Sequence, residues 1–356
     1  MNILLCYGCH TGTTGFYLER ALSREHQLFY CGPPYGLERQ GYTPSLNVAE
    51  LMRHVNSPPD LFIYIDSGVP CFPLGLERIE APTVGYLIDV HLQTKLMLHL
   101  AQFFDYVFIA QRDYVTQFQH VNPNTFWLPL ACDTEIHKRD QTDKVYEVGF
   151  VGHWQRPLER LKLLNLLSRD FMMNDFRRYF RPEEMASIYT RCKIVFNKPV
   201  NGDLNMRVFE AMACGSLLVT QRIQNGQEEL FHEGEHLVTY NSDEEAVEMV
   251  RYYLDHSEER ERIAEQGYQE AVCKHTYWHR AQKMLETVSH HDFLKAAPIR
   301  YTKPEQVLRK YLQVYASTPL VEGACDAWRK ANVPIIWKSL CLPYVFKTLL
   351  NRLRGR

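Results

Sequence analysis

The chain has 356 residues, of which 46% are hydrophobic and 23% charged, and its formal net charge is −2. This length favours two domains, and there is enough apolar material for two cores. The nearly neutral charge gives no global field that would recruit nucleic acid, so no nucleic-acid partner is expected. The first residues lack the basic region and the length of a signal peptide, and we expect a cytoplasmic protein.

Short apolar runs alternate with helical patterns in the first part of the chain, which is typical of a parallel α/β sheet. Strands are expected at 3–7, 28–30, 61–65, 83–88, 106–109 and 126–128. Apolar helical faces are expected around 18–22, 48–55 and 92–103. Because the strands are almost continuously apolar, both faces of the sheet should be covered. We take residues 1–140 as a first Rossmann-like domain.

A second α/β series follows a polar stretch, residues 133–144, which has no periodicity and is interpreted as a linker. Strands are expected at 146–151, 194–196, 217–220 and 237–240. Helices should begin at Pro157, at Pro182 and at Ser242, where Glu245 completes a capping box. Residues 145–275 are therefore predicted to form a second domain of the same class.

The first candidate site is the loop 8–15, between the first strand and the first helix, which contains Gly12 and Thr13. Amides at a helix N-terminus, with glycines that permit close approach, can bind an anion. The alternative interpretation is a tight strand-to-helix turn. The glycine spacing is not that of a dinucleotide-binding fingerprint, and strand 28–30 ends without an acid, which argues against a dehydrogenase.

A carboxylate and an imidazole, Asp89 and His91, follow the strand 83–88. Open α/β sheets bind ligands at this edge, so these two side chains are candidate catalytic groups that act as a base or orient an acceptor hydroxyl. The structural alternative is that Asp89 caps the helix that carries Leu92 and Leu96.

A third segment, 148–160, ends a strand in Gly152 and opens a helix with basic residues. Cations oppose the helix dipole there unless an anion is bound, so Arg156 and Arg160 are candidate diphosphate ligands. His153 is a further candidate for contact with phosphate or acceptor. Solvated arginines and a structural histidine are the alternatives.

The most informative segment is 197–220, where a polar loop runs into a short helix that ends in small residues and glycine. Arg207 and Glu210 are three residues apart and share a helix face near its start. One would bind phosphate, and the other would accept hydrogen bonds from ribose hydroxyls. The alternative is an ion pair on a solvated helix surface, which the apolar helix body disfavours.

The stretch 205–215, Asn-Met-Arg-Val-Phe-Glu-Ala-Met-Ala-Cys-Gly, resembles the signature of GT-B glycosyltransferases of the CgeB-like, or group 1, type. Other segments resemble that family in the same order: 105–111, 127–131, 149–152, 228–231, 275–277 and Arg280. The resemblance covers about residues 1–290. It implies two facing Rossmann-like domains, with the donor nucleotide-sugar on the second domain and the acceptor mainly on the first.

The resemblance further implies a role for Asn205, Arg207 and Glu210 in binding the donor. In related retaining enzymes a Glu-x7-Glu motif contacts the donor, and Glu210 matches its second glutamate. The first position falls on Gly202, so this chain departs from the pattern, and Asp203 is a candidate substitute. We favour retention of configuration, with a UDP-sugar as the default donor and a glycan, a lipid-linked molecule or a protein as acceptor.

The resemblance also implies catalysis without a tightly bound metal, and no cofactor is expected beyond the nucleotide-sugar substrate. The sequence shows no Asp-x-Asp at a strand end and no cluster with metal-ligand spacing. A helix that crosses back to the first domain suits residues 276–290.

Residues 291–356 form a C-terminal extension that is rich in aromatic and basic residues. Such a composition suits peripheral contact with the inner face of a membrane, although Pro334 and Pro343 are predicted to interrupt any long helix. The alternative is a tail packed on its own domains.

Three other functions remain open from the sequence. A nucleotide-sugar epimerase would share the fold and the donor. A catalytically degenerate protein that binds carbohydrate or a partner is favoured by Gly202 at a motif position. An NAD-dependent dehydrogenase is the least favoured alternative.

Overall fold

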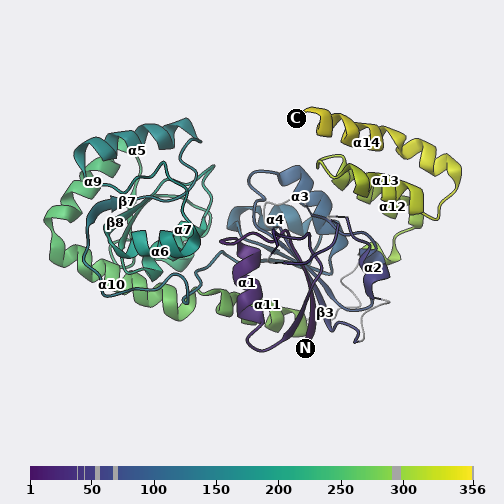
Figure 1. Cartoon of the computed structure of the whole chain (residues 1–356), viewed down its shortest axis with the longest axis horizontal. Helices are drawn as coiled ribbons and strands as arrows, with labels where there is room; N and C mark the ends of the chain where they lie inside the picture. Colours follow the sequence, from purple (N-terminus) through teal and green to yellow (C-terminus); the bar gives the residue numbers. More distant parts are fainter. Residues whose placement is uncertain (38, 44, 53–56, 67–70, 291–297, 355–356) are drawn as a thin grey trace. The chain divides into compact units, whose positions relative to one another are not determined.

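The computed structural model describes residues 1–37, 39–43, 45–52, 57–66, 71–290 and 298–354. Contacts divide the chain into two compact units (Figure 1). The first domain comprises Met1–Leu128 and Lys283–Arg356, and the second comprises Pro129–Gln282. The polar stretch 133–144 thus falls inside the second domain, whereas the sequence suggested a linker there.

Six parallel strands form the sheet of the first domain: β1 (Asn2–Cys6), β2 (Gln27–Tyr30), β3 (Leu61–Ile65), β4 (Thr83–Leu87), β5 (Tyr106–Ile109) and β6 (Thr125–Trp127). Their order is β2-β1-β3-β4-β5-β6. All residues of β3, β4 and β5 are buried, which explains why these strands are continuously apolar in sequence.

The connections of this sheet contain α1 (Thr14–Leu22), α2 (Val48–Leu51), α3 (Thr94–Leu100) and α4 (Val115–Gln119), with short 3₁₀ turns η2 (Leu76–Arg78), η3 (Ala101–Phe103) and η4 (Arg112–Tyr114). Leu92 precedes α3 and is 52% exposed, so the apolar face predicted from Leu92 onward is wrong at its first residue. The face predicted over 48–55 is helical only over α2, and Val55 lies outside the described residues.

The chain returns to the first domain with η6 (Pro298–Tyr301), α12 (Pro304–Tyr315), α13 (Val321–Lys330) and α14 (Ile335–Arg354). Tyr311 and Tyr315 of α12 are buried in the same core as Phe72 and Phe103. The Tyr315 hydroxyl donates to the carbonyl oxygen of Phe72 at 2.8 Å. The extension is therefore an integral part of this domain. None of the described helices is both long and apolar enough to cross a membrane.

The prediction that Pro343 interrupts the last helix is wrong, because Pro343 lies inside α14, a continuous helix of 20 residues. Proline removes one backbone donor, but packing of the helix on its neighbours offsets that loss. Cys341 and Thr348, on either side of Pro343, are both buried. Pro334 lies just before the helix, where its carbonyl oxygen accepts from the amide of Trp337 at 3.0 Å.

The second domain contains a four-stranded parallel sheet of β7 (Tyr146–Gly149), β8 (Cys192–Asn197), β9 (Leu217–Gln221) and β10 (Val238–Tyr240), in the order β10-β9-β8-β7. Its helices are α5 (Leu158–Asp170), α6 (Pro182–Thr190), α7 (Met206–Ala213), α8 (Gln227–Leu230), α9 (Asp243–Asp255), α10 (Ser257–Lys274) and α11 (Tyr277–His290). The boundary between the domains falls inside α11. Half of the predicted capping box of α9 is present: the Ser242 hydroxyl accepts from the amide of Glu245 at 3.1 Å, whereas Oε2 of Glu245 accepts from the amide of Asn241 at 2.7 Å.

Candidate functional site

Three loops of the second domain follow the carboxyl ends of β7, β8 and β9, and the parallel arrangement brings these ends to one edge of the sheet. The loops cover residues 150–157, 198–205 and 222–226. This edge and the helices that start from it collect most of the residues predicted from the sequence: Gly152, His153, Arg156, Arg160, Asp203, Asn205, Arg207 and Glu210.

Arg207, in the first turn of α7, joins that helix to the ends of β7 and β8. Its Nε and Nη2 donate to the carbonyl oxygen of Val151 at 3.1 and 2.7 Å, and its Nη1 donates to Oδ1 of Asn197 at 2.6 Å. A guanidinium has five N–H donors. One N–H on Nη1 and one on Nη2 have no partner among the described residues. Two directed donors at the start of a helix suit an anion.

The position of the Arg207 side chain requires a glycine at residue 152. Its φ of +141° lies in a region that side chains rarely adopt, and a Cβ built on it would lie 2.3 Å from Nη2 of Arg207. Any larger residue would therefore push the guanidinium away from the loop after β7. The glycine predicted from the sequence as a ligand-binding position thus has a steric role at the same site.

The two arginines predicted to bind diphosphate lie in opposite environments. Arg160 is buried, and its guanidinium donates to the carbonyl oxygens of Lys198 at 2.9 Å and of His153 at 2.7 Å. Burial, with the nearby charge of Arg207, lowers the pKa of Arg160 to about 10. Arg160 therefore holds two loops together. Arg156 and His153 have exposed side chains, and neither side chain has a hydrogen bond or ion pair within the described part of the chain.

Asn205 occupies the N-cap position of α7 but makes no capping hydrogen bond with its side chain. Its Nδ2 donates to Oδ1 of Asn197 at 3.3 Å, whereas its own Oδ1 is buried without a partner in the described residues. Such an acceptor costs about 1–3 kcal/mol unless a donor reaches it. Asn197 was not predicted from the sequence, although a polar residue at the end of an apolar strand is the signal that could have identified it.

The carboxylate of Asp203 closes a tight turn in front of α7. Its Oδ1 accepts from the amide of Val200 at 2.6 Å, and its own amide donates to the carbonyl oxygen of Val200 at 3.1 Å. Asn201 and Gly202, between them, have φ values of +49° and +71°. No atom lies within 4 Å of a Cβ built on Gly202, so the position that matches the missing glutamate is open.

Glu210 is buried on α7 beside a histidine, His137, that was not predicted as a site residue. Nε2 of His137 lies 3.5 Å from Oε1 of Glu210, and the exposed fractions of the two side chains are 0% and 6%. Burial raises the pKa of Glu210 to about 7, although Arg207 acts in the opposite direction. Burial lowers the pKa of His137 to about 4. The alternative of an ion pair on a solvated helix surface is therefore wrong.

Gly12 and Thr13 belong to the first domain, whereas the residues above belong to the second. Gly12 has a φ of +81°, as a tight turn requires. Thr13 is the N-cap residue of α1, but its hydroxyl donates to the carbonyl oxygen of His10 at 2.7 Å and does not cap the helix. The geometry agrees with the tight-turn interpretation, and a role in binding an anion stays a prediction.

Asp89 and His91 also lie in the first domain, in the turn that follows β4. The carbonyl oxygen of Asp89 accepts from the amides of Leu92 and Gln93, and α3 begins later, with Gln93 as its N-cap residue. The interpretation of Asp89 as the helix cap is therefore wrong. Nδ1 of His91 is buried without a hydrogen-bond partner in the described residues, which is compatible with a ligand contact.

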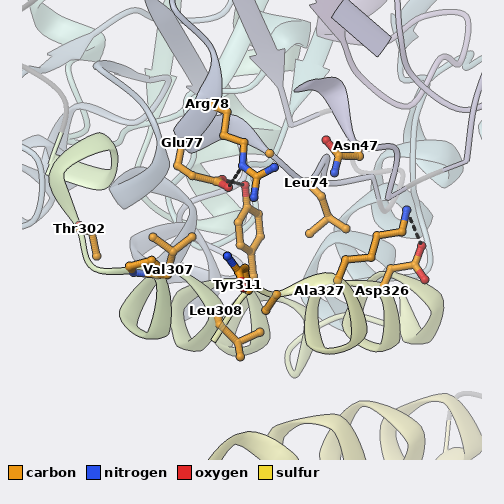
Figure 2. A pocket seen from close by; sticks show the side chains of 15 residues that line it. Asn47, Leu74, Glu77, Arg78, Thr302, Val307, Leu308, Tyr311, Asp326 and Ala327 are labelled. Carbon is orange, nitrogen blue, oxygen red and sulfur yellow. Dashed lines mark hydrogen bonds and ion pairs between the residues drawn. The ribbon is translucent and has the colours of Figure 1, made fainter. Parts of the chain in front are cut away.

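A cavity of about 240 Å³ lies elsewhere in the first domain, between η2 and the helices α12 and α13 (Figure 2). Glu77 accepts from the Tyr311 hydroxyl at 3.0 Å and pairs with Arg78, and Asp326 pairs with Lys330. None of the residues predicted from the sequence lines this cavity. Within the described ranges, no group of three or more His, Cys, Asp or Glu side chains could hold a metal ion.

A family model described as glycosyl transferase-like matches residues 142–286, which contain the whole edge described above. The second domain is a glycosyl transferase-like domain. This match bears out the enzyme class predicted from the sequence, a glycosyltransferase. It leaves the CgeB-like subtype a prediction. No curated protein matches the chain in sequence.

Several solved structures share the fold of this chain over most of its length. HepE from Anabaena, in complex with UDP-glucose, aligns with a TM-score of 0.58 and 15% identity over 82% of this chain and 100% of its own. Sucrose-phosphate synthase from Thermosynechococcus elongatus aligns with a TM-score of 0.59 and 11% identity, over 81% of this chain and 98% of its own. A glycosyltransferase from Rickettsia africae aligns with a TM-score of 0.55 and 10% identity, over 83% of this chain and 98% of its own. The predicted fold class, two Rossmann-like domains of the GT-B kind, is confirmed.

Proposed function

We propose that the protein transfers a sugar from a nucleotide-diphosphate sugar to an acceptor, and that the second domain binds the donor. The observation that carries this proposal is the start of α7, where, among the described residues, two N–H groups of Arg207 and the buried Oδ1 of Asn205 have no partner. The glycosyl transferase-like family of this domain supports the same function. A UDP-sugar is the first donor to test, since HepE was solved with UDP-glucose.

In this proposal, the chain's own cations stabilise the diphosphate as it leaves. Departure of a nucleoside diphosphate concentrates negative charge on the phosphate oxygens, and directed donors near that charge lower the barrier. Arg207 and the first amides of α7 would provide these donors, with Arg156 reaching in from the loop after β7. Glu210 would accept a hydrogen bond from a ribose hydroxyl. We propose that no tightly bound metal takes part.

The acceptor would meet the first domain, where Asp89 and His91 follow β4. A carboxylate and an imidazole in one turn suit the removal of a proton from an attacking hydroxyl, or its orientation. A glycan, a lipid-linked molecule or a protein remains the proposed acceptor class, and peripheral contact with the inner face of a membrane would suit a lipid-linked one. We favour retention, because Glu210 matches the second glutamate of the motif in retaining enzymes.

The test is to incubate the whole chain with UDP-, GDP- and dTDP-sugars, with and without pooled glycan and lipid acceptors and with and without a chelator. The account predicts that one nucleoside diphosphate is released, that its release requires an acceptor, and that the chelator does not reduce the rate of release. Conversion of the sugar to an isomer without acceptor would favour an epimerase. Loss of activity with the chelator would contradict the metal-independent part of the proposal.

A catalytically degenerate protein that binds carbohydrate or a partner is the second candidate. The observation in its favour is that Gly202 replaces the first glutamate of the motif, while Oδ1 of Asp203 is already bonded to the amide of Val200. Nucleotide affinity without turnover on any acceptor would support this alternative, and turnover would exclude it.

A further inference from the structure

The last helix of the chain, α14, has an outer face of large apolar side chains. Ile335, Ile336, Leu340, Phe346 and Leu350 are between 53% and 74% exposed. Ile335 and Phe346 are eleven residues apart, close to three helical turns, and Phe346 and Leu350 are four apart, so these residues follow one side of the helix. Soluble proteins rarely leave such a row uncovered.

The opposite side of α14 is the side that packs on the domain. Cys341 and Thr348 are buried there. The indole Nε1 of Trp328, on α13, donates to the carbonyl oxygen of Lys338 at 2.8 Å, and Nδ2 of Asn351 donates to the carbonyl oxygen of Ala316, after α12, at 2.7 Å. The helix is therefore fixed along its length, and its apolar outer face is directed away from the domain.

Positive charges predominate around this helix, although Arg329 and Lys330 of α13 are paired with Asp326 and Glu50. Residues 327–356 include seven lysines and arginines and no aspartate or glutamate. Lys347 of α14, Lys95 of α3 and Lys310 of α12 each act electrostatically on His99. Together with its burial, they lower the pKa of that histidine, and no carboxylate opposes them. Of these three, Lys95 and Lys347 are exposed, whereas Nζ of Lys310 donates to Oε1 of Gln102 at 2.5 Å.

We propose that the outer face of α14 binds an anionic lipid membrane, with the helix lying in the membrane surface. The apolar side chains would enter the boundary between headgroups and acyl chains, while the exposed Lys95 and Lys347 face lipid phosphates. Basic residues beside an apolar helical face give the two contributions, apolar burial and attraction to anionic lipid, on which interfacial binding depends.

A second copy of the chain is a less suitable partner for this face. A symmetric dimer through α14 would bring together two copies of segment 331–356, which is basic and contains no aspartate or glutamate, and like charges disfavour that contact. An anionic lipid surface matches both the apolar row and the charge. The inference extends the membrane contact in the proposed function, and it does not depend on sugar transfer, because lipid binding is measured without substrates.

The experiment is co-sedimentation of the full chain with vesicles of phosphatidylcholine alone and of phosphatidylcholine with phosphatidylglycerol. We expect binding only to the anionic vesicles, and weaker binding as salt increases. Leu350→Glu should reduce vesicle binding roughly tenfold or more, because it removes an inserted leucine. Lys347→Glu should reduce it roughly fivefold or more, because it removes a cation from the surface.

Matched controls lie on α5 of the second domain. Leu166 is 40% exposed and Lys162 is exposed, and Leu166→Glu and Lys162→Glu should leave vesicle binding unchanged. Circular dichroism establishes that each variant is folded. Absence of binding to anionic vesicles, equal binding by Leu350→Glu and wild type, or self-association that Leu350→Glu abolishes without any vesicle binding would each overturn the inference. Sugar transfer with a soluble acceptor would persist in these variants if the proposed function holds.

Discussion

The imidazole of His137 points its Nε2 at the carboxylate of Glu210, 3.5 Å away, inside the second domain. The amide of Asp133 donates to Nδ1 of His137 at 3.0 Å, which places the imidazole proton on Nε2. A neutral histidine then faces a carboxyl group whose pKa is raised to about 7 by burial. Burying the carboxylate of Glu210, the predicted ribose ligand, therefore costs folding free energy. A residue with a purely structural role would not require a carboxylate at this position.

Glu210→Gln should stabilise the protein at high pH and weaken nucleotide binding. The pKa of Glu210 is about 7 in the folded chain and 4.5 ordinarily, so its ionisation lowers the free energy of unfolding as pH rises between these values. At about pH 8 the variant should gain up to ~3 kcal/mol, and at about pH 5 little.

The pKa of His137, lowered from 6.5 to about 4, makes stability rise with pH below 6.5 in both proteins, so it does not produce the difference. Thermal unfolding across this pH range, with a UDP titration at each end, checks the prediction. A variant that is less stable than wild type at high pH would contradict it.

Arg156→Ala and Arg160→Ala should separate ligand binding from stability. Arg160 donates to the carbonyl oxygens of Lys198 and His153, so its loss should cost about 2 kcal/mol or more of unfolding free energy. Arg156 is exposed and should change stability by less than about 0.5 kcal/mol, while nucleotide affinity falls roughly tenfold. Chemical denaturation and calorimetric titration measure the two quantities. Equal nucleotide affinity for Arg156→Ala and wild type would remove Arg156 from the site.

Gly152→Ala should weaken nucleotide binding by displacing Arg207. The new Cβ would lie 2.3 Å from Nη2, in addition to the cost of a φ of +141°. Gly234→Ala is the matched control, because Gly234 also has a positive φ, +73°, but no atom lies within 4 Å of its Cβ. Both variants should lose about 1 kcal/mol of stability or more, and only Gly152→Ala should lose nucleotide affinity. Similar affinities in the two variants would show that the contact is irrelevant to binding.

Asp89→Asn and His91→Gln should lower turnover and leave nucleotide affinity unchanged, because both residues lie in the first domain. Loss of a general base typically costs 10²–10⁴-fold in rate. The measurement is kcat at saturating donor together with the Kd for the nucleoside diphosphate. If kcat is unaltered in both variants, the acceptor-side assignment fails. Lys283→Ala, at an exposed ion pair with Glu286, is a control that should change neither quantity.

Much of the fold could be predicted because buried parallel strands are continuously apolar in any context. The short strands β3 and β5 coincide with the predicted runs 61–65 and 106–109. The grouping of Asn205, Arg207 and Glu210 at the start of α7 could also be predicted, since these residues are close in sequence, and their role in binding a donor stays a prediction. What the pattern could not show is tertiary burial. Arg156 and Arg160 are the same residue type near one helix start, yet only Arg160 is enclosed by carbonyl oxygens.

His137 was missed for a related reason. It lies in the polar stretch 133–144, where the lack of periodicity suggests exposure, but its side chain is fully buried beside Glu210. Pro343 shows the reverse error, because local propensity predicted a break and packing of α14 preserved the helix. In each case, contacts between segments distant in sequence decide the outcome.

The most direct test of the central claim is calorimetric titration of UDP, GDP, dTDP and ADP into the wild-type chain and into Arg207→Ala. The account predicts that one of these nucleotides binds the wild type, and that Arg207→Ala weakens it by about 1.5–3 kcal/mol, roughly ten- to a hundredfold, while the variant stays folded. Equal affinity in the two proteins, or no affinity of the wild type for any nucleotide, would contradict a donor site at the start of α7.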